Sequence, residues 1–411
     1  MNRPDIICVS PVLPEDVRHQ IEALSANSAG LRVFTSFAYT AGSPVERAMR
    51  QVDALVGSSL HRRTERRKLD AHLARQLICW PWMDVWQKAA RLAGLASGGP
   101  RAQDCCFGAI DRIAARSLST QTQAVIGRED ACSRTFRAAK IVGAACLYDL
   151  PTAHYQTVRR VMADEAREFG KHQPLEQEYA HDRNRRKDRE LSLADHVVVA
   201  SSFVRESVEQ AGIGRAHVTT IPYGCPPPVV PTSVRRPVVL YVGHLSLRKG
   251  TLRLLRVWKR LGAYRTHQLR LIGKLHLPAS ALEEYRGNFE HIPHLPRPEL
   301  WQHYAAARLF VFPSAADGFG IVMNEALACG TPVLASSNTG APGFITPGVE
   351  GLIYPFGDDD ALAASLDRML TRTDETAAMG QAALELARRW SWEEYRRAFV
   401  DLVKRLLSRE S

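Results

Sequence analysis

Two carboxylates, Asp317 and Glu325, stand eight positions apart in the last third of the chain. They belong to SAADGFGIVMNEALACGTPVLAS, residues 314–336, where glycines and a short apolar run separate them. Such residues could form an acid–base pair or clamp a ligand at two points. Structural roles are equally open: Asp317 could cap a helix and Glu325 could be a solvated helix residue.

The residues around the carboxylates predict where each would lie. Strand-like LFVFPS (309–314) comes first, and a helical pattern begins near Gly320. Glu325 would then lie about one and a half turns into the helix, with Asp317 on the loop before it. Backbone N–H groups would be exposed at the helix start, those of Gly320, Ile321 and Val322. The carboxylates would therefore contact different parts of one ligand and would not share a proton.

A second segment combines two cations with a glycine turn. In YVGHLSLRKG (241–250) a buried strand ends at Gly243 and a helix follows, so Arg248 and Lys249 lie beside a helix N-terminus. Two cations at the positive end of a helix suit a diphosphate. A surface Arg–Lys pair on an ordinary loop is equally compatible with this segment alone, which lacks the P-loop pattern.

Alternating strands and helices would position both segments. Apolar runs predict strands at 238–243, 269–273, 309–314, 332–336 and 351–355. Helical periods cover 251–261, 296–307, 320–330 and 358–370. This alternation predicts a parallel sheet covered on both faces, as in a Rossmann-like domain.

The first half shows the same alternation less clearly. Strand-like runs lie at 6–10, 31–37, 123–127, 144–150 and 196–201, and helical stretches at 156–194 and 206–212. Residues 58–100 show no period and hold Trp80, Trp82 and Trp86. We expect a second Rossmann-like domain with a helical insertion.

These patterns predict an α/β protein of two doubly wound domains with a cleft between them. The boundaries we expect are 1–220 for the first domain, 221–237 for a proline-rich linker, 238–388 for the second domain and 389–411 for a C-terminal helix. In such sheets ligands bind at the carboxyl ends of the strands.

Charge and composition narrow the class of partner. The chain of 411 residues carries a formal net charge of +11, with basic clusters at 61–68, 183–189 and 396–399. This excess suits anionic substrates or a membrane surface, although interleaved acids also fit solvated helix faces. No nucleic-acid-binding signature accompanies it. No apolar run reaches the roughly 20 residues of a membrane span, so we expect a cytoplasmic protein and leave a peripheral contact with the inner membrane face open.

The eight cysteines show no CxxC pair, which favours free thiols over disulfides or zinc. The acidic run DDD (358–360) starts a helix after PFG, so helix capping explains it better than a metal site. We therefore expect no metal and no cofactor.

Several motifs in order resemble the retaining GT-B glycosyltransferases of the family-4 type. DGFGIVMNEALACGTPVLAS is similar to that family's pair of acidic residues followed by A-x-A-x-G-x-P-V. VGHLSLRKG resembles its phosphate loop, IPYGC the start of its second domain, and WSWEEYRRAFVDLVKRLL its terminal helix. The resemblance covers residues 190–411 well and the first half weakly.

The resemblance implies a role for each matched residue. Glu325 would hold the ribose of a nucleotide, and Asp317 the hydroxyls of a donor sugar. Arg248 and Lys249 would neutralise the diphosphate, and the backbone at Gly320, Ile321 and Val322 would contact sugar and phosphates. The terminal helix would cross back onto the first domain.

Four features depart from the family pattern, and one of them is Gly343, which stands where family members often carry an acid. The first acid is Asp317, one methylene shorter than the usual Glu, and His244 replaces a usual basic residue. The usual glycine-rich loop after the first strand is missing from SPVLPEDVRHQ (10–20).

In LYDLPTAHY (147–155), His154 matches a family histidine that faces the donor sugar, although a helix-start histidine without a ligand fits equally. Asp149 in the same loop is a weaker candidate.

The function we expect is metal-independent, retaining transfer of a sugar from a nucleotide-diphosphate donor to a glycan, lipid-linked or small-molecule acceptor. One alternative is a catalytically silent homologue that binds a nucleotide sugar as a scaffold or regulator. A phosphorylase or epimerase on the same fold is another.

Overall fold

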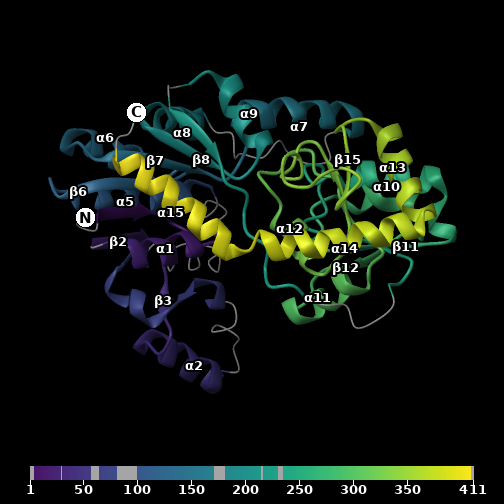
Figure 1. The fold of residues 1–411 in the computed structure, drawn as a ribbon, viewed down its shortest axis with the longest axis horizontal. Helices are drawn as coiled ribbons and strands as arrows, with labels where there is room; N and C mark the ends of the chain where they lie inside the picture. The colour runs from purple at the N-terminus through teal and green to yellow at the C-terminus, as the bar shows by residue number, and fades with distance from the viewer. Residues whose placement is uncertain are drawn as a thin grey trace.

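The chain forms two α/β domains, each built on one parallel sheet (Figure 1). The computed structural model describes residues 4–28, 30–56, 64–80, 100–170, 181–213, 216–229 and 235–408. Trp82, Trp86 and parts of the 61–68 cluster and of the 221–237 linker lie outside these ranges.

The C-terminal sheet has the strand order β12-β11-β10-β13-β14-β15, and every pairing in it is parallel. Its strands are β10 (Val238–Val242), β11 (Gln268–Ile272), β12 (Glu290–Ile292), β13 (Leu309–Phe312), β14 (Val333–Ser336) and β15 (Gly351–Tyr354). The order runs outward in both directions from β10 and β13, which is the doubly wound Rossmann arrangement. The predicted fold class is confirmed.

The N-terminal sheet follows the same plan, with the order β5-β2-β1-β6-β7-β8-β9. Its strands are β1 (Asp5–Val9), β2 (Gly30–Thr35), β5 (Leu77–Cys79), β6 (Thr122–Arg128), β7 (Ala145–Leu150), β8 (His196–Val199) and β9 (His217–Thr220). A small parallel pair, β3 (Tyr39–Thr40) and β4 (Lys68–Leu69), lies beside it.

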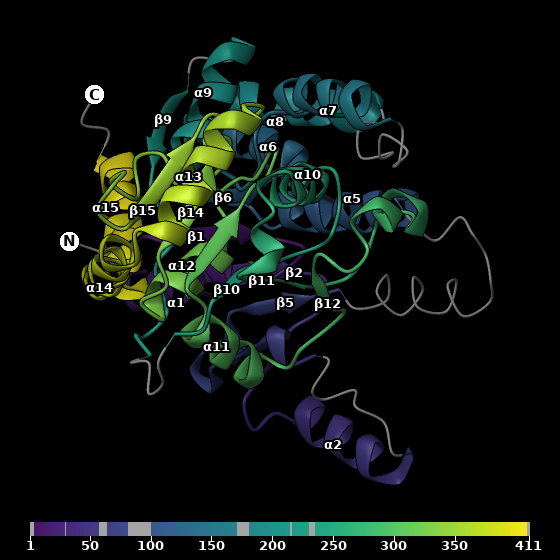
Figure 2. The ribbon, with the colours of Figure 1, turned by 90° about the vertical axis from the view of Figure 1, so that its right-hand side faces the viewer.

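Helices cover both sheets, as Figure 2 shows from the side. The N-terminal domain has α1 (Glu15–Asn27), α2 (Pro44–Val56), α5 (Pro100–Arg116), α6 (Ser133–Val142), α7 (Tyr155–Phe169), α8 (His181–Leu193) and α9 (Ser202–Ala211). The C-terminal domain has α10 (Thr251–Leu261), α11 (Arg297–Ala306), α12 (Ile321–Ala328), α13 (Asp359–Thr371) and α14 (Thr373–Arg389). The last helix, α15 (Trp392–Ser408), follows α14. Among the described residues, no helix is long and apolar enough to span a bilayer.

Two sequence predictions for the first domain need correction. Residues 58–100 are not wholly irregular, because Leu77–Cys79 forms the edge strand of the main sheet, paired with β2. The single helical stretch predicted over 156–194 contains two helices, α7 and α8, and residues 171–180 lie outside the described ranges. A strand as short as β5 gives no readable alternation in sequence.

Helix α15 leaves the second domain and packs on the first (Figure 1). The ring of Trp392 stacks on His19 of α1 at a centroid distance of 4.2 Å. The buried amide of Gln20 donates a hydrogen bond of 2.9 Å to the hydroxyl of Tyr395. The end of the chain thus completes the surface of its first helix.

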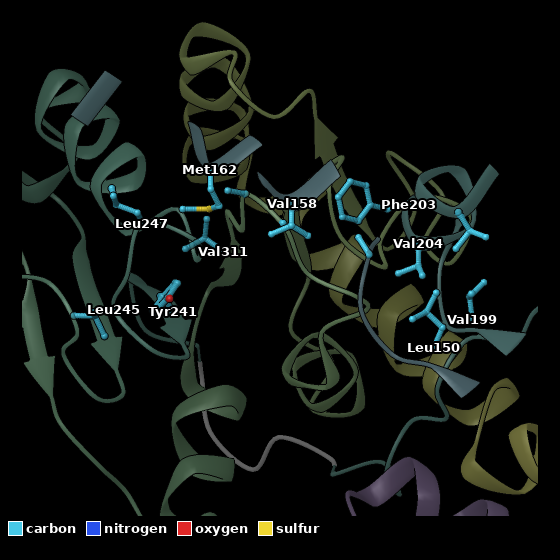
Figure 3. Packing of buried hydrophobic residues seen from close by; sticks show 14 of the residues in the cluster. Leu150, Val158, Met162, Val199, Phe203, Val204, Tyr241, Leu245, Leu247 and Val311 are labelled. Carbon is cyan, nitrogen blue, oxygen red and sulfur yellow. The ribbon is translucent and has the colours of Figure 1, made fainter. Parts of the chain in front are cut away.

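The two domains share one apolar cluster, part of which Figure 3 shows. Val158 and Met162 of α7 belong to the same cluster as Leu247 and Val311 of the C-terminal domain. At its edge the guanidinium of Arg253 lies 2.6 Å from Glu165 of α7 and 2.8 Å from Asp359. Buried charges at a joint need such partners, so the domains are held in contact by both apolar and ionic groups.

Candidate active site

The candidate site lies at the point where the strand order of the C-terminal sheet reverses, between β10 and β13. The loops after these two strands, 243–250 and 313–320, run together: the N–H of Ala315 donates to the carbonyl of Arg248 at 2.8 Å. A Cβ on Gly250, which has a φ of +69°, would lie 1.8 Å from the carbonyl oxygen of Pro313. A residue without a side chain is therefore needed for this close approach. Ligands of doubly wound sheets bind at such a switch point.

The loop contact brings Arg248, Lys249 and Asp317 together. The ammonium of Lys249 pairs with the carboxylate of Asp317, and Nε of Arg248 donates to the carbonyl of Ala316 at 3.1 Å. Burial would raise the pKa of Asp317, but the charges of Lys249 and Arg248 outweigh it and hold that pKa below its usual value. Asp317 is thus an anion placed against the cations that were predicted to hold a diphosphate.

The start of α12 presents backbone N–H groups next to this ion pair. Gly320 precedes the helix with a φ of +97°, and a Cβ there would meet the ring of Phe312 at 2.3 Å. Among the described residues, no side chain caps the helix. Ile321 and Val322, in its first turn, are partly exposed, whereas the residues that follow are buried. The helix therefore begins where the sequence predicted, and its first N–H groups lie beside the Lys249–Asp317 ion pair.

Glu325 lies on the same helix but away from Asp317's cations. Its carboxylate accepts a hydrogen bond of 3.0 Å from the hydroxyl of Tyr304 and lies 3.2 Å from the guanidinium of Arg297. Burial raises the pKa of Glu325 and Arg297 partly offsets this. The two carboxylates therefore have separate partners, which fits two ends of a clamp and not a proton-sharing pair.

The N-terminal domain touches this site through the loop after β7. A Cβ on Gly318 would lie 1.8 Å from the carbonyl oxygen of Pro151, so the two loops are in direct contact. The hydroxyl of Ser201 also donates to the carbonyl of Gly318 at 2.6 Å. The cleft predicted between the domains is closed at this point.

His154 follows Pro151 and precedes α7. Its Nε2 lies 3.1 Å from Asp188 of α8, and its Nδ1 is buried with no hydrogen-bond partner among the described residues. Burial lowers the pKa of His154, and Asp188 opposes that shift. The ring is thus held by its own domain, and one buried nitrogen is left to bond a further group.

Asp149, the weaker candidate, is part of a buried ion cluster. Arg128 lies 2.5 Å from Asp149 and 2.6 Å from Asp16 of α1. One guanidinium therefore serves two carboxylates. This arrangement accounts for Asp149 as a structural residue under the C-terminal helix.

The structure adds partners that the sequence did not single out, for the candidate Glu325 and for His244. Arg297 also reaches Glu15 of the first domain at 3.3 Å, so Glu325 is linked to α1. His244 stacks on His276 at a centroid distance of 4.6 Å. Burial, then His276, Lys249 and Lys274, lower the pKa of His244. Lys274 and His276 belong to the segment GKLH (273–276), and its position after a strand next to β10 was the sequence signal that could have found them.

Residues 228–386 match the family model described as glycosyl transferases group 1. The matched residues span the linker and most of the C-terminal domain. The curated relatives match over shorter segments. A D-inositol 3-phosphate glycosyltransferase of Kribbella flavida is 40% identical over 99 residues, 24% of this chain and 23% of that protein. The O-antigen chain mannosyltransferase B of Escherichia coli is 32% identical over 120 residues, 29% of this chain and 31% of that protein.

Solved structures match over nearly the whole chain. Sucrose-phosphate synthase from Thermosynechococcus elongatus aligns with a TM-score of 0.61 and 19% identity, over 99% of this chain and 100% of that one. Anabaena HepE in complex with UDP-glucose aligns with a TM-score of 0.57 and 16% identity, over 97% and 99%. These likenesses show that the chain has a GT-B fold, whose second domain contains most of the residues matched by the family model.

Proposed function

We propose that this chain is a retaining glycosyltransferase that moves a sugar from a nucleotide diphosphate to an acceptor. The observation that carries the proposal is the convergence of Arg248, Lys249 and the uncapped N-terminus of α12 at the switch point of the C-terminal sheet. Cations and N–H groups so placed stabilise the charge of a departing diphosphate. The UDP-glucose complex of HepE is consistent with this assignment.

Each candidate residue then has a defined task. Glu325 accepts hydrogen bonds from the ribose hydroxyls, as the resemblance implies, while Tyr304 orients its carboxylate. Asp317 accepts from the sugar hydroxyls, and the diphosphate replaces it as the partner of Lys249. The Nδ1 of His154, which has no hydrogen-bond partner in the described part of the chain, is suited to a sugar hydroxyl across the domain joint.

The transfer step needs no covalent sugar–enzyme intermediate. The bond between the sugar's anomeric carbon and the diphosphate oxygen breaks, and the acceptor oxygen bonds to the same face of that carbon. The departing phosphate oxygen takes the acceptor's proton. Because Lys249 and Arg248 already supply positive charge, we propose that the reaction is independent of metal and cofactor.

Binding of the donor tests the proposal. We expect nucleotide diphosphates and their sugars to raise the melting temperature of the wild type by mass action. The shift should be lost in Glu325→Ala and Lys249→Ala and kept in Lys404→Ala, which removes an exposed cation from α15. No shift with any nucleotide diphosphate would overturn the donor site.

The Lys249–Asp317 ion pair also favours a second candidate, a silent homologue whose phosphate-binding lysine is permanently neutralised. Such a protein would bind a nucleotide without releasing it from a nucleotide sugar. Release of nucleotide diphosphate from the donor, abolished in Lys249→Ala, would exclude it.

A further inference from the structure

A pocket of about 400 Å³ lies between α5, α6 and α8 of the N-terminal domain. Its lining includes no residue of the C-terminal domain and none of the candidate donor-site residues. Five arginines line it: Arg134 and Arg137 from α6, and Arg185, Arg186 and Arg189 from α8. The arginines of α8 belong to the basic stretch 183–189 of the sequence. The arginines of α6 line the same pocket.

The spacing of these arginines gathers their charge on one side of each helix. Arg134 and Arg137 are three positions apart on α6, and Arg185 and Arg189 are four apart on α8. Residues at these spacings share a helix face, and like charges there repel. Helices α6 and α8 pack against each other, so the two charged faces meet at one pocket.

Carboxylates neutralise only part of this charge. Arg185 pairs with Asp182 at 2.5 Å, and Arg186 pairs with Asp104 at 2.7 Å. Asp111 of α5 also lines the pocket. Its carboxylate accepts hydrogen bonds from the backbone N–H groups of Arg134 and Thr135, both at 2.8 Å.

Three guanidinium groups form no ion pair with a carboxylate within the part of the chain that the structure describes, those of Arg134, Arg137 and Arg189. Arg134 donates to the carbonyl of Gly108 at 3.4 Å. Burial raises the pKa of Asp111, and the charge of Arg134 opposes that shift. Ion pairs between described residues therefore balance only part of the positive charge of the pocket.

We propose that this pocket is a second anion site that binds a phosphate group, separate from the donor site. The planar guanidinium suits two-point contact with phosphate oxygens. At neutral pH a phosphate group carries one negative charge as a diester and nearly two as a monoester, and its several acceptor oxygens can contact more than one cation. Either a soluble phosphate ester or the phosphate of a lipid headgroup supplies this chemistry.

The test compares two double variants of the full chain. Arg137→Gln/Arg189→Gln removes two pocket cations, whereas Arg112→Gln/Arg116→Gln removes two exposed cations of α5 that do not line the pocket. Arg and Gln have similar helix propensities, so both variants should fold. Binding of inorganic phosphate is followed by thermal shift against sodium chloride at equal ionic strength.

We expect the pocket variant to bind phosphate roughly tenfold more weakly, while the α5 variant and Lys249→Gln keep a phosphate response. Equal responses in wild type and pocket variant would overturn the site. Equal weakening in both double variants would also overturn it, since diffuse charge would then explain binding.

Vesicles separate the two sources of phosphate. Cosedimentation with phosphatidylcholine vesicles that contain phosphatidylglycerol, lost only in the pocket variant, would identify a lipid headgroup. Phosphate binding without vesicle binding would identify a soluble ester. The nucleotide response is measured on the same samples, so a failure of the donor site is seen separately from a failure of this pocket.

Discussion

At the residue scale, the proposed function gives Lys249 two alternative partners. In the structure the lysine is neutralised by Asp317, and under the proposal the donor's diphosphate would replace that carboxylate. The Asp317 carboxylate would then be available to the sugar hydroxyls. A single short side chain would in this way link phosphate binding to sugar recognition.

The variant Asp317→Asn distinguishes phosphate binding from sugar recognition. We expect nucleotide diphosphate to bind as tightly as in wild type or more tightly, because Lys249 no longer has a competing anion. Sugar transfer should fall by roughly tenfold to a hundredfold, because a charged hydrogen-bond acceptor for the sugar is lost. Calorimetry with the nucleotide and a transfer assay check this. A parallel loss of both would show that Asp317 does not distinguish sugar from phosphate.

Asp149 predicts a pH dependence of stability. Burial, opposed by Arg128 and reinforced by Asp16, raises the pKa of Asp149 from 3.8 to about 6. A carboxyl with a raised pKa stabilises the fold below its unfolded pKa, and this contribution is lost as the pH rises through the folded value. The free energy of unfolding of wild type relative to Asp149→Asn should therefore decrease between about pH 4 and pH 6. Urea unfolding of both proteins at several pH values measures this difference in free energy. A difference that does not change with pH would contradict the prediction.

At the element scale, the N-cap residue of α9 also forms a hydrogen bond between the two domains. The hydroxyl of Ser201 accepts the N–H of Val204 at 3.2 Å as a helix cap and donates to Gly318 of the other domain at 2.6 Å. One side chain thus serves a local and a long-range contact. The corresponding cap of α13, Asp358, accepts only N–H groups of its own helix.

Ser201→Ala should lower the free energy of unfolding by roughly 1–3 kcal/mol, the sum of a lost cap and a lost buried hydrogen bond. Asp358→Ala should cost about 1 kcal/mol, the cap alone. Urea unfolding compares the two variants, with Ser201→Thr as a control that keeps the hydroxyl. A loss in Ser201→Ala no larger than in Asp358→Ala would show that the bond to Gly318 adds nothing.

The elements of the second domain were largely predictable, because strands such as 238–242 are apolar and α10 shows a clear helical period. Those of the first domain were less so. Strand β9, HVTT, is short and partly exposed, and it belongs to the sheet only through its partner β8. Arg297 could not be assigned from sequence, because its contact with Glu15 depends on how the domains meet.

At the scale of the whole molecule, the domain joint is built around the close approach of Gly318 to Pro151. The shared apolar cluster and the ion pair between Arg253 and Glu165 also connect the two domains. The proposed donor-binding residues all lie in the C-terminal domain, and His154 lies in the N-terminal domain. Catalysis should therefore depend on this contact far more than donor binding does.

Gly318→Ala tests that dependence, since its Cβ would lie 1.8 Å from the carbonyl oxygen of Pro151. We expect transfer to fall by about a hundredfold, as for a misplacement of roughly 1 Å, with nucleotide affinity little changed. Small-angle scattering should show a larger radius of gyration. Full activity and unaltered scattering would mean that the joint is not required for transfer.

The return of α15 to α1 has a consequence for how the chain is made. A ribosome delivers residues in order, so His19 and Gln20 emerge long before Trp392 and Tyr395 that cover them. Until the second domain has been synthesised, the face of α1 that α15 covers remains exposed to water and to other nascent chains. Folding of the two domains is therefore not independent, and a nascent chain stalled before residue 392 would carry an incomplete first domain.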